Sequence, residues 1–336
     1  ALGSIGVTGS SAANAAAARA DLVIGVGTRL ADFTTGSRSL FAAARVAQIN
    51  VQAFDAHKHD ALAVVGDART VLQALARELS GWHAGVEVGR QQEIEEWNAA
   101  VDAATTGIDA QTQPSDAQVI GAVQRSCGDD AIVVCAAGGL PGELHKLWRS
   151  ARQGSYHVEY GFSCMGYEIA GGMGVKMAAP DRDVVVMVGD GSYLMANSEL
   201  ATSVMLGHKL IVVLLDNRGY GCINRLQHAT GGAGFNNLLA DATHQVLPQI
   251  DFAAHAASLG ALSEHVTSLG ELTAAMVRAR KAERSYVVVI DTDPLKSTEA
   301  GGWWWDVAVP EVSQRPEVEA ARRAYEQGTR MKRDLS

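Results

Sequence analysis

Cysteine is scarce in this chain of 336 residues, which contains only four. The four are widely scattered, and none forms a CxxC pair. Secreted domains that depend on disulfides carry cysteine at a much higher density. The sequence therefore predicts no disulfide scaffold, and a reducing cytoplasm is the expected setting. The four positions are Cys127, Cys135, Cys164 and Cys222.

Long apolar runs and an excess of basic residues are also absent. No stretch approaches the length of a membrane-spanning helix, and residues 1–14 lack the basic start of a signal peptide. With 28 basic and 37 acidic residues, the net charge of −9 leaves no broad basic surface for phosphate backbones. We therefore expect no membrane and no nucleic acid partner. The initiator Met is missing too, which indicates that the chain begins inside a longer parent protein.

Two common phosphate-binding motifs are missing as well. A dinucleotide site requires GxGxxG directly after a strand, whereas the run Gly25, Val26, Gly27 has no third glycine. A P-loop requires Lys after its last glycine, but Gly172 follows Gly171. The sequence therefore disfavours a dehydrogenase and excludes a P-loop enzyme.

What the chain does contain is a series of apolar runs of strand length, separated by helical stretches. The runs are continuous rather than alternating, as expected for parallel strands that helices cover on both faces. The sequence therefore predicts an α/β fold with a doubly wound parallel sheet. The predicted strands are residues 21–26, 46–51, 131–135, 184–188, 210–215 and 286–290.

A glycine turn follows the predicted strand 184–188. Gly189 and Gly191 flank Asp190 and allow a ligand to approach the backbone without a Cβ in the way. Ser192 is a candidate for the N-cap of the following helix or for a phosphate donor. Such a turn is as often purely structural, so it does not define a site alone. The following helix is predicted from the face shared by Ala196, Leu200 and Val204.

Oxygen ligands also follow the next predicted strand, 210–215. Its end carries Asp216 and Asn217, and Gly219 comes two residues later. Open parallel sheets bind ligands at the carboxyl ends of their strands, and Mg²⁺ prefers oxygen ligands that it combines with phosphate oxygens. The side chains of Asp190 and Asn217 and the carbonyl of Gly219 therefore form a candidate Mg²⁺ site.

Together the two turns resemble the signature of thiamine diphosphate (ThDP) enzymes of the acetolactate synthase-like family. In that family a GDG turn, a helix and an apolar strand precede a pair of asparagines. Asn217 lies 27 residues after Asp190, which is the spacing of the family. The resemblance implies that Asp190, Asn217 and the Gly219 carbonyl bind Mg²⁺, which bridges the diphosphate. Asp216 replaces the first asparagine, which is not the metal ligand of the pair.

Two upstream segments resemble cofactor-contacting segments of the same family. The resemblance implies that Met165 is the wedge that holds ThDP bent, and that the Ser163 carbonyl accepts a hydrogen bond from its amino group. Gly138 and Gly139 stand where the family has a second diphosphate loop. Without the resemblance, Met165 is an ordinary core residue and the glycines form a plain turn. The implied cofactor contacts are Gly138, Gly139, Ser163, Met165, Gly189, Gly191 and Ser192.

The resemblance covers nearly the whole chain and implies a domain division. Residues 1–82 correspond to the C-terminal half of a Rossmann-like central domain, and the polar residues 83–113 form a linker. Residues 114–300 correspond to the diphosphate-binding domain. Residues 301–336 contain three tryptophans and a helical tail, which packs on its own domain or on a partner.

Within the family, the sequence is most similar to a branch that acts in myo-inositol catabolism. Residues 54–59, 217–227 and 303–305 are among the segments that carry this likeness. It implies Mg²⁺- and ThDP-dependent hydrolysis of a C–C bond in a cyclic, polyhydroxylated 1,2-dione. Two alternatives stay open: an acetolactate synthase or another 2-oxo acid lyase or carboligase, and a non-catalytic remnant that binds ThDP.

The glutamate that activates the cofactor in this family belongs to a pyrimidine-binding domain, which is missing from this chain. Glu143 and Glu168 lie in segments expected to face the diphosphate or the thiazolium, so neither is assigned that role. The resemblance therefore implies an inactive fragment of a parent of roughly 640 residues. The missing domain is expected from the parent or from a second subunit of a homo-oligomer.

Other polar residues beside the implied cofactor segments are weaker candidates. Three histidines are candidate proton donors, although a lone histidine is more often a surface or core residue. Three residues after the metal ligands are candidate contacts to a hydroxylated substrate. The histidines are His145, His157 and His228, and the candidate substrate contacts are Asn224, Arg225 and Gln227.

Overall fold

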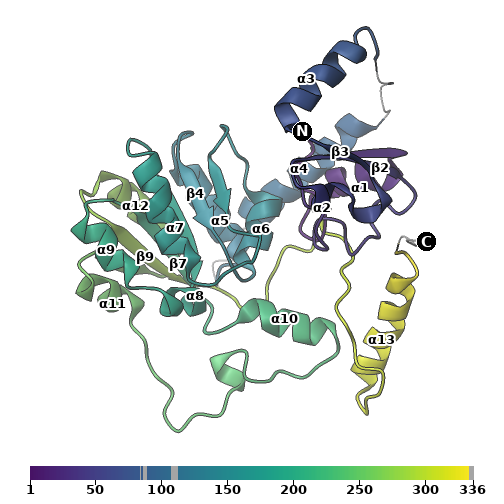
Figure 1. Cartoon of the computed structure of the whole chain (residues 1–336). Helices are drawn as coiled ribbons and strands as arrows, with labels where there is room; N and C mark the ends of the chain where they lie inside the picture. Colours follow the sequence, from purple (N-terminus) through teal and green to yellow (C-terminus); the bar gives the residue numbers. More distant parts are fainter. Residues whose placement is uncertain (84, 86–88, 107–112, 333–336) are drawn as a thin grey trace. The chain divides into compact units, whose positions relative to one another are not determined.

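The computed structural model describes residues 1–83, 85, 89–106 and 113–332. The chain divides into two compact units, which Figure 1 shows coloured along the sequence. The first unit consists of Ala1–Ala100 and Glu299–Ser336, and the second is Val101–Thr298. Helix α4, at Arg90–Thr106, contains the point of division. The predicted linker 83–113 lies partly outside the described residues.

A parallel three-stranded sheet with the order β1-β2-β3 forms the centre of the first unit. Its strands are β1 (Leu22–Val26), β2 (Arg45–Asn50) and β3 (Leu62–Val65). The other elements of this unit are α1 (Ser11–Arg19), α2 (Ala53–Ala56), η1 (Lys58–Asp60), α3 (Ala68–Glu78) and α13 (Pro316–Thr329). A small core packs on one face of the sheet and includes Leu40, Phe41 and Val46.

Several apolar side chains of this small sheet are open to solvent. The parallel register aligns Ile24 of β1 with Ala47 of β2, and Ala47 with Leu62 of β3. Ile24 is 52% exposed and Leu62 is 72% exposed. Leu22 and Val26 lie on the same side of β1 as Ile24 because side chains alternate along a strand. Parallel strands are usually covered on both faces, so this face is unusually bare among the described residues.

The tryptophan run fastens the C-terminal segment to the first unit. The indole N–H of Trp303 donates to Ser39 Oγ at 3.0 Å, and that of Trp305 donates to the Asp32 carboxylate at 2.9 Å. The rings of Phe33 and Trp305 meet edge to face, with centroids 5.3 Å apart. The tryptophan segment therefore packs on its own chain.

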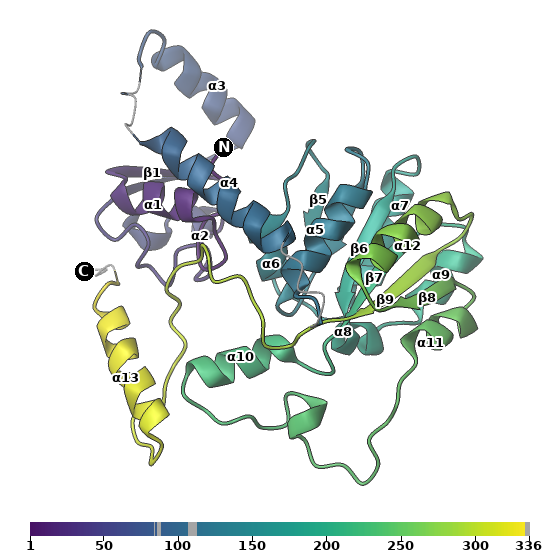
Figure 2. The same cartoon turned by 180° about the vertical axis from the view of Figure 1, so that it is seen from behind.

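The second unit is built on a six-stranded parallel sheet with the order β5-β4-β6-β7-β9-β8. The strands are β4 (Ile132–Cys135), β5 (Tyr156–Val158), β6 (Val184–Gly189), β7 (Ile211–Asp216), β8 (Leu262–Val266) and β9 (Tyr286–Asp291). Figures 1 and 2 show α5 and α12 on one face of this sheet and α7 on the other. The predicted α/β fold with a doubly wound parallel sheet is confirmed.

Helices and short turns connect the strands of the second unit. They are α5 (Asp116–Ser126), α6 (Leu140–Leu147), α7 (Tyr167–Ala178), α8 (Asp190–Met195), α9 (Glu199–Met205), α10 (Gly221–Ala229), η2 (Leu239–Asp241), α11 (Phe252–Ser258) and α12 (Leu269–Lys281). Within the described ranges, no helix has the length and apolarity needed to cross a membrane.

The inner strands of the large sheet are apolar and buried along their length. Every residue of β4 and β7 is buried, and Val134, Val186 and Leu214 are fully enclosed. Side chains of α7 and α11 complete this core, among them Ile169 and Phe252. Burial on both faces explains why these strands have continuous apolar sequences.

Three strands were missed by the sequence analysis, and all three lie at the edge of a sheet. They are β3 in the first unit and β5 and β8 in the second. An edge strand has one neighbour and is less buried, so it does not need a continuous apolar run. Strand β5 has only three residues, all half-buried, and β8 carries polar Glu264 and His265 in its middle.

One predicted helix is wrong in its extent. The segment after Asp190 was expected to form a single helix with Ala196, Leu200 and Val204 on one face. The structure has a break, because α8 ends at Met195, Ala196 has φ −150° and ψ 51°, and α9 begins only at Glu199. Leu200 and Val204 still pack on the core, but Ala196 belongs to neither helix.

Candidate cofactor site

Two adjacent inner strands of the large sheet carry the predicted metal ligands after their carboxyl ends. These ends lie together along one edge of the sheet, perpendicular to the outermost strands. Strands β6 and β7 are paired in parallel, with Gly189 opposite Leu215. Asp190 therefore follows β6 next to the place where Asp216 ends β7. The carboxylate of Asp190 accepts a hydrogen bond from the backbone N–H of Gly219 at 2.9 Å. The structure thus brings Asp190 and the turn after β7 together, as the sequence predicted for a shared site.

Negative charge is concentrated at this edge. Asp190 is only 6% exposed, and burial together with the negative charge of nearby Asp216 raises its pKa to about 7. Burial also raises the pKa of Asp216, although its carboxylate accepts from the backbone N–H of Arg218 at 3.0 Å and pairs with the Arg218 guanidinium at 3.1 Å. Two carboxyl groups whose pKa values are raised mainly by burial would be stabilised as anions by a bound cation.

An uncompensated oxygen lies in the same turn. The side-chain oxygen of Asn217 is buried and has no hydrogen-bond partner in the described part of the chain. A buried amide oxygen without a partner costs free energy unless something else satisfies it. The amide oxygen of Asn217, a carboxylate oxygen of Asp190 and the carbonyl of Gly219 are hard oxygen donors of the kind that Mg²⁺ accepts. The residues present therefore fit an Mg²⁺ ion.

The loop that carries Gly219 is fixed by a second segment of the chain. Gly219 has φ +144° and forms an isolated antiparallel bridge with Leu238. The neighbouring N–H of Tyr220 donates to the Asn237 carbonyl at 2.7 Å. A Cβ at residue 219 would lie 2.9 Å from the Leu238 Cα, so glycine is required at this position.

Ser192 has a different local role from the predicted N-cap. The N-cap of α8 is Gly189, and Ser192 lies inside the helix. Its hydroxyl donates to the buried carboxylate of Glu168 at 2.8 Å and accepts from the N–H of Gly166, also at 2.8 Å. The N-cap interpretation is therefore wrong, whereas the role of Ser192 toward a diphosphate stays a prediction.

Glu168 joins three segments of the site, a role that the sequence did not reveal. Besides Ser192, the backbone N–H groups of Ala137 and Gly166 donate to its carboxylate, at 3.2 and 3.1 Å. Glu168 is 1% exposed, and this burial raises its pKa. No local pattern distinguishes such a buried acid from a surface glutamate on a helix, because two of its donors, Ala137 and Ser192, lie on distant segments.

The two glycines after β4 differ in their surroundings. Gly138 has φ +84°, and a Cβ built there would meet nothing within 4 Å, so the space beside it is open. At Gly139 a Cβ would overlap Nη2 of Arg225 from α10. Nη1 of Arg225 donates to the carbonyl of Pro294 at 2.7 Å. The structure therefore gives Arg225 an internal partner and places it against the predicted diphosphate loop.

Of the two predicted ring-contacting residues, Met165 lies beside α8. The Cε of Met165 is 3.6 Å from the point that a Cβ on Gly191 would occupy. Ser163 has φ +54°, a left-handed conformation that is uncommon for residues other than glycine. Glu159 supports this turn by accepting from the N–H groups of Phe162 and Cys164, at 2.9 and 2.8 Å. Met165 and Gly191 are therefore brought together.

A cluster of hydrogen-bonded polar groups connects the segment after β9 to α6. Glu143 accepts from the N–H and the hydroxyl of Thr298, at 3.0 and 2.5 Å, and Lys146 donates to the Thr298 carbonyl at 2.8 Å. Asp116, at the start of α5, is 6% exposed. Burial raises its pKa to about 6, although the nearby positive charge of Arg225 favours the anion. None of these contacts was foreseen from the sequence.

The three candidate histidines have different environments. The Nε2 of His157 lies 2.7 Å from the hydroxyl of Tyr167, and their rings are stacked. His145 stacks on Tyr160 with centroids 4.7 Å apart, and burial lowers its pKa. His228 lies in the last turn of α10. The tyrosine partners of the first two were not predicted.

Comparisons with known proteins show the enzyme family to which these segments belong. Residues 136–290 match the family described as "Thiamine pyrophosphate enzyme, C-terminal TPP binding domain", and residues 1–75 match "Thiamine pyrophosphate enzyme, central domain". Thiamine pyrophosphate is another name for ThDP. The first match contains all the predicted metal ligands.

Similar proteins are found among enzymes with curated names. The chain is 39% identical to the 3D-(3,5/4)-trihydroxycyclohexane-1,2-dione hydrolase of Geobacillus thermodenitrificans, over 99% of this chain and 56% of the relative. It is 41% identical to the hydrolase of the same name from Bacillus cereus, over 95% of this chain and 55% of the relative. The chain thus spans about half the length of the curated relatives it matches.

A solved structure shares the fold. The Rhodococcus jostii RHA1 thiamine diphosphate-dependent 4-hydroxybenzoylformate decarboxylase superposes with a TM-score of 0.64 over 81% of this chain and 49% of that protein. Its 19% sequence identity supports a shared fold alone. With the two domain matches and the identities to the hydrolases, the resemblance seen in the sequence is confirmed. The chain belongs among the thiamine pyrophosphate enzymes, with residues 1–75 matching their central domain and residues 136–290 their C-terminal TPP binding domain.

Proposed function

We propose that this chain supplies the diphosphate- and Mg²⁺-binding half of an enzyme that opens a cyclic, polyhydroxylated 1,2-dione by hydrolysis of a C–C bond. The observation that carries the proposal is the buried, partnerless oxygen of Asn217 next to the buried carboxyl group of Asp190. Both lie within the matched cofactor-binding domain. The names of the similar hydrolases support the substrate class.

In this proposal the metal ligands are Asp190, Asn217 and the Gly219 carbonyl. The open space at Gly138 and the glycine turn around Asp190 would accept the diphosphate, with backbone N–H groups and the hydroxyl of Ser192 as donors. Met165 would hold the cofactor bent, and the Ser163 carbonyl would accept from its amino group. The remaining proposed cofactor contacts are Gly139, Gly189 and Gly191.

When bound, ThDP supplies a nucleophilic carbon and holds the electrons released by C–C cleavage. The overall reaction adds one water across the bond between the two carbonyl carbons, leaving a carboxylate on one carbon and an aldehyde on the other. The share of this chain is anchoring and proton transfer. His157, which pairs with Tyr167, and His145 are two of the proposed proton donors. His228 is the third.

Activation of the cofactor needs a residue from another polypeptide segment. Glu143 and Glu168 both accept hydrogen bonds from groups of this chain, so neither carboxylate is available for that task. We therefore propose that a pyrimidine-binding domain, from the parent or from a second subunit of a homo-oligomer, completes the site. The bare apolar side chains Ile24 and Leu62 support a covering polypeptide. A reducing cytoplasm fits the four free cysteines.

The test has two parts. Calorimetry should detect ThDP binding by the purified chain only when Mg²⁺ is present. The chain is then mixed with the N-terminal part of the Geobacillus relative that it does not match, and the mixture is assayed with the trihydroxycyclohexanedione and with pyruvate. Turnover of the dione alone supports the proposal. Turnover of pyruvate would indicate a 2-oxo acid lyase or carboligase, and cofactor binding without any turnover would indicate a non-catalytic remnant.

A further inference from the structure

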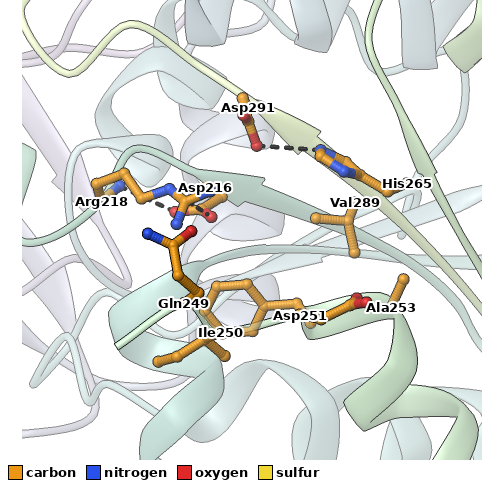
Figure 3. Close-up of a pocket in the computed structure, with 10 residues that line it drawn as sticks. Asp216, Arg218, Gln249, Ile250, Asp251, Ala253, His265, Val289 and Asp291 are labelled. Atoms are coloured by element: carbon orange, nitrogen blue, oxygen red, sulfur yellow. Dashed lines mark hydrogen bonds and ion pairs between the residues drawn. The ribbon is translucent and has the colours of Figure 1, made fainter. Parts of the chain in front are cut away.

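A second concave site lies at the carboxyl edge of the large sheet, beside the ends of β7, β8 and β9. Its volume is about 290 Å³, which is at the lower end of the range for small-molecule sites. Figure 3 shows the side chains that line it. They come from the end of β7, the residues around the start of α11, and the ends of β8 and β9. None of the proposed metal ligands or cofactor contacts is among them.

The polar groups of this cavity are arranged as pairs. Arg218 and Asp216 form an ion pair at 3.1 Å, and His265 lies 3.1 Å from the Asp291 carboxylate. Gln249 adds an exposed side-chain amide to the lining, as Figure 3 shows. Each pair contains a hydrogen-bond donor and a hydrogen-bond acceptor. A ligand whose groups both donate and accept hydrogen bonds can therefore satisfy both members of a pair.

The remaining wall is apolar. Val289 of β9 is 3% exposed, and Phe252 of α11 is 5% exposed. Together with half-buried Ile250 they form the apolar part of the cavity lining. A ligand with an apolar C–H face as well as hydroxyl groups would therefore contact both kinds of surface.

Other ligand classes fit this lining less well. Within the described ranges, no group of three His, Cys, Asp or Glu residues is arranged to hold a metal ion. An anion would meet a single guanidinium, that of Arg218, against the carboxylates of Asp216, Asp251 and Asp291. A neutral molecule avoids this repulsion.

We propose that the cavity binds a neutral, polyhydroxylated ring, with its hydroxyl groups on Arg218, Gln249, His265 and Asp291 and its C–H face on Ile250 and Val289. The proposal stands on the cavity itself and takes only its probe from the proposed function. The site is separate from the diphosphate site, although Asp216 lines the cavity and directly precedes the proposed metal ligand Asn217.

The test measures binding of myo-inositol, a neutral cyclic hexol, to the 336-residue chain by calorimetry and by ligand-observed NMR. We expect saturable binding that weakens about tenfold in Gln249→Ala and in Asp291→Ala, since each loses one or two hydrogen bonds. Gln153→Ala, an exposed glutamine outside the cavity, is the matched control and should bind like wild type. Circular dichroism confirms that each variant is folded.

Asp190→Ala separates this proposal from the proposed function. It should weaken Mg²⁺-dependent ThDP binding about 100-fold or more, whereas myo-inositol should still bind saturably. The proposal is overturned if wild type shows no saturable binding, if the two cavity variants bind as tightly as Gln153→Ala, or if inorganic phosphate binds more tightly than myo-inositol. Equal loss of myo-inositol binding in Asp190→Ala would also overturn it, because the probe would then occupy the cofactor site.

Discussion

The backbone N–H of Gly219 donates a hydrogen bond of 2.9 Å to the carboxylate of Asp190, although the two residues follow different strands. This contact closes the glycine turn after β6 against the turn after β7. It orients one carboxylate oxygen and holds Gly219, whose carbonyl is the proposed third metal ligand, close to Asp190. The contact exists within the chain itself, so the two turns are preorganised for a ligand.

Asp190→Ala should remove both the carboxylate ligand and this link. We expect Mg²⁺-dependent ThDP binding to weaken about 100-fold or more, equal to at least about 2.7 kcal/mol. Isothermal calorimetry in the presence and absence of Mg²⁺ measures the change. Asp129→Ala, an exposed acid in the same unit, is the control and should leave the affinity unchanged. Wild-type affinity in Asp190→Ala would rule out the metal assignment.

Asn217→Leu should separate stability from ligand binding. The Asn217 oxygen is buried without a partner, so an apolar side chain of similar size should keep or raise the free energy of unfolding of the unliganded chain. The same substitution should abolish Mg²⁺-dependent ThDP binding. Urea titrations and calorimetry test the two effects, with Asn197→Leu as the control for binding. A destabilised chain that still binds ThDP would contradict the role of Asn217.

Asp116 should make stability depend on pH. Its pKa is raised from 3.8 to about 6, mainly by burial. As pH rises from about 4 to about 6, the unfolded chain therefore loses this proton while the folded chain keeps it, and the free energy of unfolding falls. Above about pH 6 Asp116 is ionised in both the folded and the unfolded chain, so the free energy of unfolding stops falling.

Asp116→Asn should remove this loss. The variant should match wild type near pH 3.5 and be more stable by up to roughly 3 kcal/mol above pH 7, which corresponds to a shift of about two pKa units. Urea titrations from pH 3.5 to pH 8 give the difference between the two proteins, so pH effects from other groups cancel. Parallel stability curves would show that Asp116 does not titrate in this range.

Gly139 and Arg225 should be energetically coupled. A Cβ at residue 139 overlaps Nη2 of Arg225, so Gly139→Ala must displace the guanidinium and its bond to the Pro294 carbonyl. We expect Gly139→Ala to lower the free energy of unfolding by about 1 kcal/mol in the wild-type background and by much less in the Arg225→Ala background. A double-mutant cycle from urea titrations measures the coupling. Gly174→Ala, where a Cβ has open space within α7, is the control and should not destabilise the chain. If the losses in the free energy of unfolding caused by Gly139→Ala and Arg225→Ala are additive, the contact is disproved.

The centre of the fold was predictable from the sequence because burial on both faces leaves a visible trace. Strands β4, β6, β7 and β9 appear as continuous apolar runs, and the structure buries them. The edge strands β5 and β8 have no such trace. The break after Met195 was also hidden, because an alanine at residue 196 is compatible with a continuous helix and the sequence alone does not specify its backbone conformation.

The candidate site was predictable only where its residues are close together in sequence. Asp190 and Asn217 stand in short motifs at strand ends, so their place at the sheet edge follows from the order of elements. Glu168 and Ser192 are 24 residues apart, and Arg225 meets Gly139 from a different helix. Such contacts depend on how distant segments pack, which no local pattern records. The cavity around Asp291 is formed in the same way.

The parallel direction of all six strands has a practical consequence for protein engineering. Every carboxyl end lies at one edge of the sheet, and the proposed ligands and the cavity lie at that edge. The opposite edge carries none of the residues proposed here for binding. Exposed residues such as Asp181, which shortly precedes β6, are therefore suitable positions for fluorescent labels or surface immobilisation that report on ligand binding without blocking it.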